Sequence, residues 1–177
     1  KKAIQQILKW IDMGMNPVNI SVNQSKIVFY HENYISELKS LLEEYNVSGS
    51  YITLEVLEST VIEDIDMFNS ILTEVKKLGF SVSLDDFGSG YSSLNVLSKL
   101  QIDELKIDRI FLHTKSEVDN QRTKWILESI IDIAKKSQIL VVVEGVESKQ
   151  DDLFIKNLGA DVGQGYFYGR PLSIARL

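Results

Sequence analysis

The chain has 177 residues, enough for one domain with a sizeable core, and 44% of them are hydrophobic and 25% charged, as in an ordinary globular protein. The absence of cysteine excludes disulfide scaffolds and thiolate metal sites, and a net charge of −6 without a cluster of lysine or arginine argues against a nucleic-acid polymer as partner. No apolar run approaches the roughly 20 residues that cross a bilayer, so we expect a cytoplasmic segment without membrane contact, any membrane anchor of the parent protein lying outside it.

Helix-like and strand-like segments alternate along the chain. Hydrophobic periodicity predicts a helix at 3–11, a strand at 18–22, a helix at 33–45, a strand at 51–56, a helix at 65–78 and a strand at 81–84. The pattern continues with a helix at 92–100, a strand at 104–107, a helix at 123–134, a strand at 139–143, a helix at 150–158 and a last short strand after 159–163. Six strands separated by helices predict a parallel sheet, either a doubly wound open sheet or a (β/α)8 barrel. Trp10 and Trp125 lie in helical stripes and are predicted to pack in the core.

Every predicted strand carries a polar residue at or near its C-terminal end. These residues are Asn19, Glu55, Asp85, Asp86, Lys106, Asp108, Glu144, Glu147 and Gln164. Barrel enzymes build their active sites at that edge of the sheet. Carboxylate and amide oxygens without clustered histidine or cysteine are the ligands of hard cations such as Mg, Mn or Ca. Two such ions, about 3.5–4 Å apart, would suit attack on a phosphodiester.

Each of these residues taken singly also has an ordinary structural interpretation. The alternatives are helix-start acids for Glu55 and Glu58, a turn and cap for Asp85-Asp86, an ion pair for Lys106 with Asp108, a helix cap for Glu144 to Glu147, a loop amide for Gln164 and a structural role for Asn19. Their joint placement on successive strand ends favours the functional interpretation.

The motifs in combination resemble those of the EAL-domain family. Asn19-Ile20-Ser21 is similar to the family's Asn-x-Ser strand, and Glu55-Val56-Leu57-Glu58 to its Glu-x-Thr-Glu element, with leucine in place of threonine. The most diagnostic stretch is Asp85 to Leu94, and the later motifs are Leu105 to Arg109, Glu144 to Glu147 and Gln164 to Tyr166. The name-giving Glu-Ala-Leu motif does not occur in the chain. We therefore expect residues 1–177 to be the central and C-terminal part of an EAL domain, N-terminally truncated, with that strand and the next one upstream.

The resemblance implies an α/β fold, a modified TIM (β/α)8 barrel that is incomplete here, with about six of eight strands. It implies hydrolysis of cyclic di-GMP to linear pGpG in bacterial signalling, with Mg or Mn at a two-metal site. The implied metal ligands are Asn19, Glu55, Asp85, Asp86 and Glu144, and the implied catalytic residues are Lys106 and Glu144. Substrate contacts are implied for Asp108, Glu147 and Gln164, and positioning of the loop after Asp86 for Glu58, Gly88 and Gly90. A homodimer through the region after Asp86 and an upstream sensory or diguanylate-cyclase-like domain are further implications.

Two other functions stay open at this point. One is an inactive EAL-like module that binds cyclic di-GMP or a protein partner without turnover. The other is an unrelated metal-dependent barrel lyase with Lys106 as its base. Because the strand that supplies the family's name-giving glutamate is absent from these residues, we expect the 177-residue chain alone to hydrolyse the substrate poorly.

Overall fold

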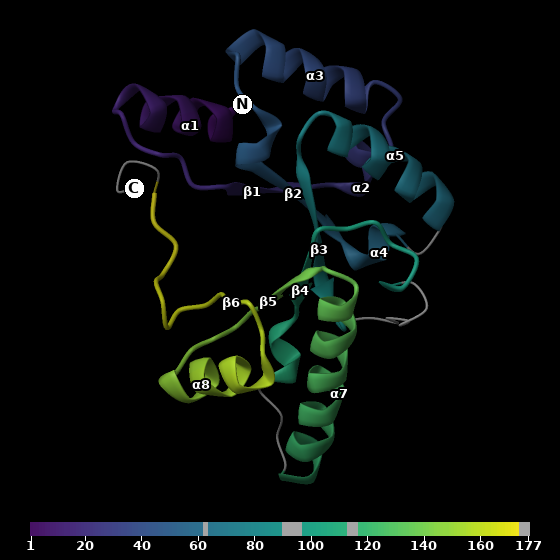
Figure 1. Cartoon of the computed structure of the whole chain (residues 1–177), viewed down its shortest axis with the longest axis vertical. Helices are drawn as coiled ribbons and strands as arrows, with labels where there is room; N and C mark the ends of the chain where they lie inside the picture. Colours follow the sequence, from purple (N-terminus) through teal and green to yellow (C-terminus); the bar gives the residue numbers. More distant parts are fainter. Residues whose placement is uncertain (62–63, 90–96, 113–116, 174–177) are drawn as a thin grey trace. The chain divides into compact units, whose positions relative to one another are not determined.

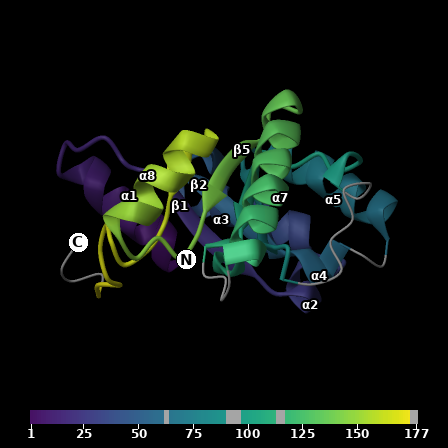
Figure 2. The same ribbon diagram turned by 90° about the horizontal axis from the view of Figure 1, so that it is seen from below.

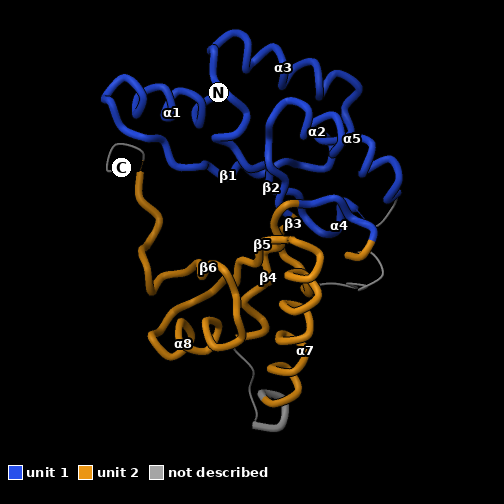
Figure 3. Tube along the Cα trace, in the orientation of Figure 1, with its two compact units in different colours: residues 1–83, 99–102 blue, residues 84–98, 103–177 orange. Residues whose placement is uncertain are grey.

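The computed structural model describes residues 1–61, 64–89, 97–112 and 117–173. The chain divides into two compact units, residues 1–83 with 99–102 and residues 84–98 with 103–177 (Figure 3). The described residues contain a six-stranded sheet whose strands follow chain order, β1-β2-β3-β4-β5-β6, and β3 (Ser81–Phe87) contributes to both units. The predicted α/β class with six strands is therefore confirmed.

Unit 1 contains the N-terminal elements (Figure 1). In chain order they are α1 (Lys2–Asp12), β1 (Ile20–Gln24), α2 (Lys26–Phe29), α3 (Tyr34–Tyr45), the 3-10 turn η1 (Gly49–Tyr51), β2 (Ile52–Leu57), α4 (Glu58–Val61), α5 (Ile65–Lys77) and the first residues of β3. Strands β1 and β2 are parallel. The core of this unit includes Phe29, which is fully buried and stacks on Phe68 with ring centroids 5.1 Å apart.

Strand β1 begins two residues later than the sequence pattern predicts. The residue before it, Asn19, is held at the N-terminal edge of the sheet, where its amide Nδ2 donates to the carbonyl of Ser50 at 3.1 Å and the hydroxyl of Thr53 donates to its Oδ1 at 2.8 Å. The strand ends at Gln24, and Ser25 caps the short helix α2, which the pattern did not predict. Inter-strand pairing with β2 therefore decided the boundary, which hydrophobic periodicity had placed too early.

Unit 2 contains the end of β3 and the elements after it. They are β4 (Glu104–Ile107), the 3-10 turn η2 (Arg109–Phe111), α7 (Glu117–Lys136), β5 (Leu140–Val143), α8 (Lys149–Leu158) and β6 (Val162–Gly163). Strands β4, β5 and β6 are parallel, and α7 packs on β5 and lies beside it in both views (Figure 1 and Figure 2). Helix α8 starts with a capping box between Ser148 and Asp151 and ends at Gly159, whose φ of 88° is left-handed. Both ends of α8 are thus set by local sequence.

The stripe that α7 buries differs from the predicted one. Leu127, Ile131 and Ala134 are buried, whereas Trp125 is 59% exposed, so the prediction that this tryptophan packs in the core is wrong. Residues at spacings of three and four from Leu127 face the core, and Trp125 is out of phase with them. Most of the predicted helix 92–100 lies outside the described residues. None of the helices in the described ranges is long and apolar enough to cross a membrane.

Candidate active site

The end of β3 supplies two adjacent carboxylates with different backbone conformations. Asp85 is buried, and the Asp86 N–H donates to its Oδ1 at 3.1 Å. Asp86 itself has a φ of 58°, a left-handed conformation that costs a residue with a Cβ about 1–2 kcal/mol. Gly88 follows with a φ of 94°, and a Cβ there would lie 2.3 Å from Cε2 of Phe111. The chain therefore turns sharply directly after the carboxylate pair, and this turn accepts only glycine at position 88. Gly90, predicted to share that role, lies outside the described residues.

Strands β4 and β5 bring a lysine and a third carboxylate to the same place. The Lys106 ammonium lies 3.0 Å from Asp85 Oδ1 and 2.7 Å from Glu144 Oε1, and this side chain is almost fully enclosed, with 4% of the residue exposed. The backbone N–H of Glu144 donates to the carbonyl of Ile107 at 3.0 Å, which fixes the start of the loop after β5 against the end of β4. Three consecutive strands of unit 2 thus deliver their polar side chains to one cluster.

The charges in this cluster favour a divalent cation. One oxygen from each of Asp85, Asp86 and Glu144 lies within 4.8 Å of the others. Burial raises the pKa of Glu144; its hydrogen bond and charge interaction with Lys106 oppose that rise, and the two aspartates add to it. One ammonium against three carboxylates leaves an excess of negative charge that a hard, oxygen-seeking cation would neutralise. The residues present therefore fit the metal that the sequence motifs imply.

The three residues of unit 2 that were predicted to contact substrate lie close in sequence to the cluster residues, and each makes a local hydrogen bond. Asp108 is half-buried, and its carboxylate accepts the N–H of Ile110 at 2.8 Å as the cap of η2. Glu147 is exposed, and its backbone N–H donates to Asp151 at 3.1 Å. Gln164 is also exposed, and its backbone N–H donates to the carbonyl of Val143 at 2.9 Å. Their predicted roles as substrate contacts stay predictions.

In unit 1, the two predicted glutamates are buried on β2 and at the start of α4. Glu55 is in register with Asn23 of β1, which sequence reasoning missed, and not with Asn19. Asn19 lies four residues earlier, about 13 Å away along an extended strand, at the opposite edge of the sheet. The sequence did contain a signal, because the Asn-x-Ser spacing occurs twice, at Asn19 and again at Asn23-Gln24-Ser25. Choosing between the two copies requires the strand boundary.

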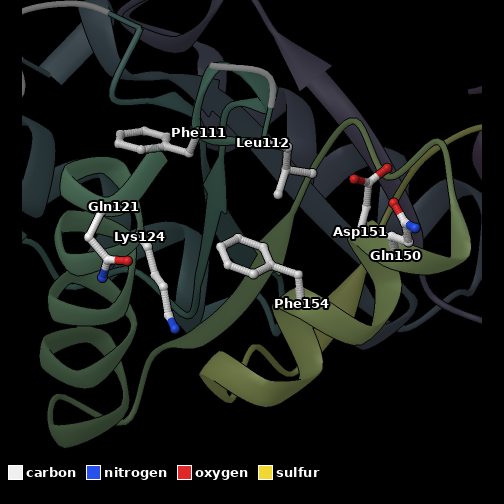
Figure 4. A pocket seen from close by; sticks show the side chains of 7 residues that line it. All are labelled: Phe111, Leu112, Gln121, Lys124, Gln150, Asp151 and Phe154. Atoms are coloured by element: carbon white, nitrogen blue, oxygen red, sulfur yellow. The ribbon is translucent and has the colours of Figure 1, made fainter. Parts of the chain in front are cut away.

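Unit 2 also has a groove of about 350 Å³ that is separate from the carboxylate cluster (Figure 4). It is lined by Phe111, Leu112, Gln121, Lys124, Gln150, Asp151 and Phe154. None of these residues is among the predicted site residues. The groove nevertheless shares a wall with the site, since Phe111 packs against Gly88.

A buried lysine between carboxylates, at the ends of parallel strands, defines an α/β protein with a site suited to a divalent cation. The particular family follows from comparison with known proteins. The EAL domain family model matches residues 1–171, and the chain belongs to the EAL domain family. The resemblance seen in the sequence motifs is therefore confirmed.

The relatives include named cyclic di-GMP enzymes. The chain is 34% identical over 176 residues to the Pseudomonas aeruginosa bifunctional diguanylate cyclase/cyclic di-GMP phosphodiesterase MucR, covering 99% of this chain and 25% of that protein. It is 32% identical over 171 residues to the Escherichia coli cyclic di-GMP phosphodiesterase PdeR, covering 96% of this chain and 25% of that protein. The chain thus spans about a quarter of the length of these curated relatives.

A solved structure of the same family supports the fold. The chain superposes on the MucR phosphodiesterase in complex with c-di-GMP with a TM-score of 0.88 at 34% identity, over 99% of this chain and 70% of that one. The Mycobacterium smegmatis DcpA EAL domain gives a TM-score of 0.87 at 27% identity, over 99% and 78% of the two chains. The predicted relation to the modified barrel of EAL domains is confirmed by these matches.

Proposed function

We propose that this chain is the part of an EAL domain that binds cyclic di-GMP and takes part in its metal-dependent hydrolysis to linear pGpG. The observation that carries the proposal is the buried Lys106 ammonium between Asp85 and Glu144, within a carboxylate cluster suited to a divalent cation. The names of the relatives, which are cyclic di-GMP phosphodiesterases, favour hydrolysis over an inactive binding module and over a lyase.

We propose metal ligands within each unit taken by itself. Asp85, Asp86 and Glu144 would hold Mg or Mn in unit 2. In unit 1, Glu55 would serve together with its register partner Asn23, which we propose in place of Asn19. When bound, a divalent ion would supply positive charge near the phosphate and lower the pKa of a water molecule. Two such ions would stabilise the negative charge on both the attacking and the leaving oxygen.

The chain's own residues account for the positioning and the proton transfer. A water oxygen attacks the phosphorus, the bond to the 3′ oxygen breaks, and the released 3′ oxygen takes a proton from solvent. Glu144 accepts the water's proton, a role that suits a carboxylate whose pKa is raised by burial. Lys106, fixed by its two carboxylate partners, stabilises the negative charge that develops on the phosphate oxygens.

The remaining predicted residues would complete the site around these groups. We propose substrate contacts for Asp108, Glu147 and Gln164, and positioning of the loop after Asp86 for Glu58, Gly88 and Gly90. Glu58 is buried at the start of α4.

The test is product analysis with the 177-residue chain, cyclic di-GMP and either Mn²⁺ or Mg²⁺. We expect slow, metal-dependent formation of pGpG, and we expect Asp85→Asn to abolish it. The control is Lys124→Met, which changes an exposed lysine in the separate groove and should leave pGpG formation unchanged. Metal-dependent binding without product would favour the inactive module instead. The absence of both cyclic di-GMP binding and pGpG formation would overturn the proposal.

The assembly and the cellular context are further parts of the proposal. We propose a homodimer through the region after Asp86, of which residues 90–96 lie outside the described part of the chain, and size-exclusion chromatography with light scattering tests it. An additional sensory or diguanylate-cyclase-like domain is supported by the bifunctional relative, of which this chain spans 25%. A cytoplasmic location stays a prediction.

A further inference from the structure

A buried carboxylate on α8 is bonded to a tyrosine near the end of the described chain. The Tyr168 hydroxyl donates to Asp152 Oδ1 at 2.5 Å, and the Lys156 ammonium lies 2.9 Å from Asp152 Oδ2. Asp152 is only 7% exposed. The hydrogen bond from Tyr168 and then the one from Lys156 lower the pKa of Asp152, and the bond to Asp152 raises the pKa of Tyr168 to about 12. At neutral pH a neutral phenol therefore donates to an ionised carboxylate, which is the stronger, charge-assisted kind of hydrogen bond.

Tyr168 closes a turn that lies directly on Val146. The Val146 N–H donates to the carbonyl of Gln164 at 3.0 Å, and the Phe167 N–H donates to the carbonyl of Val146 at 3.0 Å. Gly165, between them, lies so close that a Cβ would be 2.2 Å from the Val146 carbonyl oxygen. The Tyr168 N–H donates to the carbonyl of Gly165 at 3.1 Å and completes the turn. Two backbone hydrogen bonds thus join the turn to Val146.

Val146 is two residues from the candidate catalytic carboxylate. Gly145 separates Glu144 from Val146, has a φ of 73°, and faces Arg109 so closely that a Cβ would lie 2.2 Å from that residue's own Cβ. The Glu144 N–H is held by Ile107 of β4. The segment from Glu144 to Val146 is therefore fixed by β4 at its start and by the 164–168 turn at its end.

Val146, the 164–168 turn and α8 are connected to one another in three ways. The chain itself runs from Val146 into α8 through the capping box at Ser148. Two backbone hydrogen bonds connect Val146 to the turn. The side-chain hydrogen bond from Tyr168 to Asp152 connects the turn to α8. Without this last hydrogen bond, the turn and Val146 could shift together relative to α8.

We propose that Tyr168, through its bond to Asp152, is a positioning residue that holds the Glu144 carboxylate in the metal-binding cluster. The proposal rests on the proposed function, because it assigns Glu144 to the metal site. Tyr168 itself touches neither metal nor substrate in this account. Its hydroxyl acts through the turn and Val146 on the backbone that carries Glu144.

The test compares Tyr168→Phe with the unchanged 177-residue chain by amide hydrogen exchange and by Mn²⁺ titration. Loss of the hydroxyl should speed exchange of the Val146 and Phe167 amides about tenfold, since one hydrogen bond no longer opposes the local opening. The dissociation constant for Mn²⁺ should rise several-fold. The melting temperature should fall by a few degrees at most, because one hydrogen bond is lost and the aromatic ring is retained.

Two further variants separate this role from general loosening. Asp152→Asn keeps an acceptor oxygen for Tyr168 and should retain most of the protection, whereas Asp152→Leu should reproduce Tyr168→Phe. Lys156→Met removes the exposed ammonium that pairs with Asp152 and should leave the exchange of the Val146 amide unaffected. Equal protection in Tyr168→Phe and the unchanged chain would overturn the proposal. So would faster exchange that extends equally to the amide of Asp108, which is bonded to Phe87.

The same experiment distinguishes failure of the positioning role from failure of the proposed function. If the unchanged chain binds no Mn²⁺, the metal-dependent function is overturned, yet exchange confined to Val146 and Phe167 still supports the link from Tyr168. If Mn²⁺ binds and Tyr168→Phe alters neither exchange nor affinity, the positioning role alone is overturned.

Discussion

Replacing Lys106 by methionine tests how the carboxylate cluster is held together. The methionine keeps most of the apolar stem of the lysine, so the change removes the ammonium and little packing. The side chains of Asp85 and Glu144 are 12% and 20% exposed and would be left without this counter-charge. Removing one partner of a buried ion pair costs about 3–5 kcal/mol. Because both carboxylates keep some contact with solvent, we expect a loss at the lower end, about 3 kcal/mol at pH 7.

The loss should depend on pH in a defined direction. The pKa of Glu144 is raised above its ordinary value of 4.5 by burial, and Lys106 opposes that rise. In Lys106→Met the pKa of Glu144 rises further, so the native state binds a proton more tightly than the unfolded chain does. Stability of the variant therefore increases as the pH falls from 7 toward about 5, and the gap to the unchanged chain narrows.

The assay is urea unfolding in the presence of a chelator at pH 7 and at about pH 5.5, followed by tryptophan fluorescence. Lys136→Met is the matched control, because its exposed pair with Asp132 is worth only about 0.3–0.5 kcal/mol. A loss for Lys106→Met below about 1 kcal/mol, or an equal loss at both pH values, would refute the reasoning.

Four further substitutions test individual contacts. Asn23→Ala should weaken Mn²⁺ binding about tenfold without much effect on stability. Asn19→Ala should leave Mn²⁺ binding unchanged and lower the free energy of unfolding by about 1 kcal/mol. Mn²⁺ titration and urea unfolding of both variants decide between the two asparagines. Ser83→Ala should raise the free energy of unfolding by up to about 1 kcal/mol, because the buried Ser83 hydroxyl has no hydrogen-bond partner among the described residues; a destabilised variant would contradict this. Gly165→Ala should lower the melting temperature by several degrees, because its Cβ overlaps the backbone of Val146, and an unchanged melting curve would show that the turn can move away.

The alternation of helices and strands was predictable because each element carries its own local pattern. The strand at 104–107 was predicted with its observed bounds, and the helices at 65–78 and 150–158 to within one residue. These elements have clear hydrophobic periodicity and end at residues such as Gly159 that stop a helix. The direction that a long amphipathic helix faces was less predictable, as Trp125 shows, because α7 has several apolar residues and only packing decides which are buried.

The sequence by itself determined the family and the type of site. Carboxylates, an amide and a lysine after successive strands predict a cation site at one edge of a parallel sheet, and Asp85, Asp86, Lys106 and Glu144 do meet there within unit 2. Their convergence follows from strand direction alone, since the C-terminal ends of parallel strands lie at the same edge.

Only the tertiary structure decided which of two Asn-x-Ser copies pairs with Glu55, and which distant groups hold Glu144. Asn23 is in register with Glu55 because hydrogen bonds between β1 and β2 set the alignment, and that alignment depends on both strands together. The link from Tyr168 to Asp152 joins residues sixteen positions apart through side chains that have no motif in common. Motifs report what each strand end carries, and the contacts between elements determine which of those residues can act together.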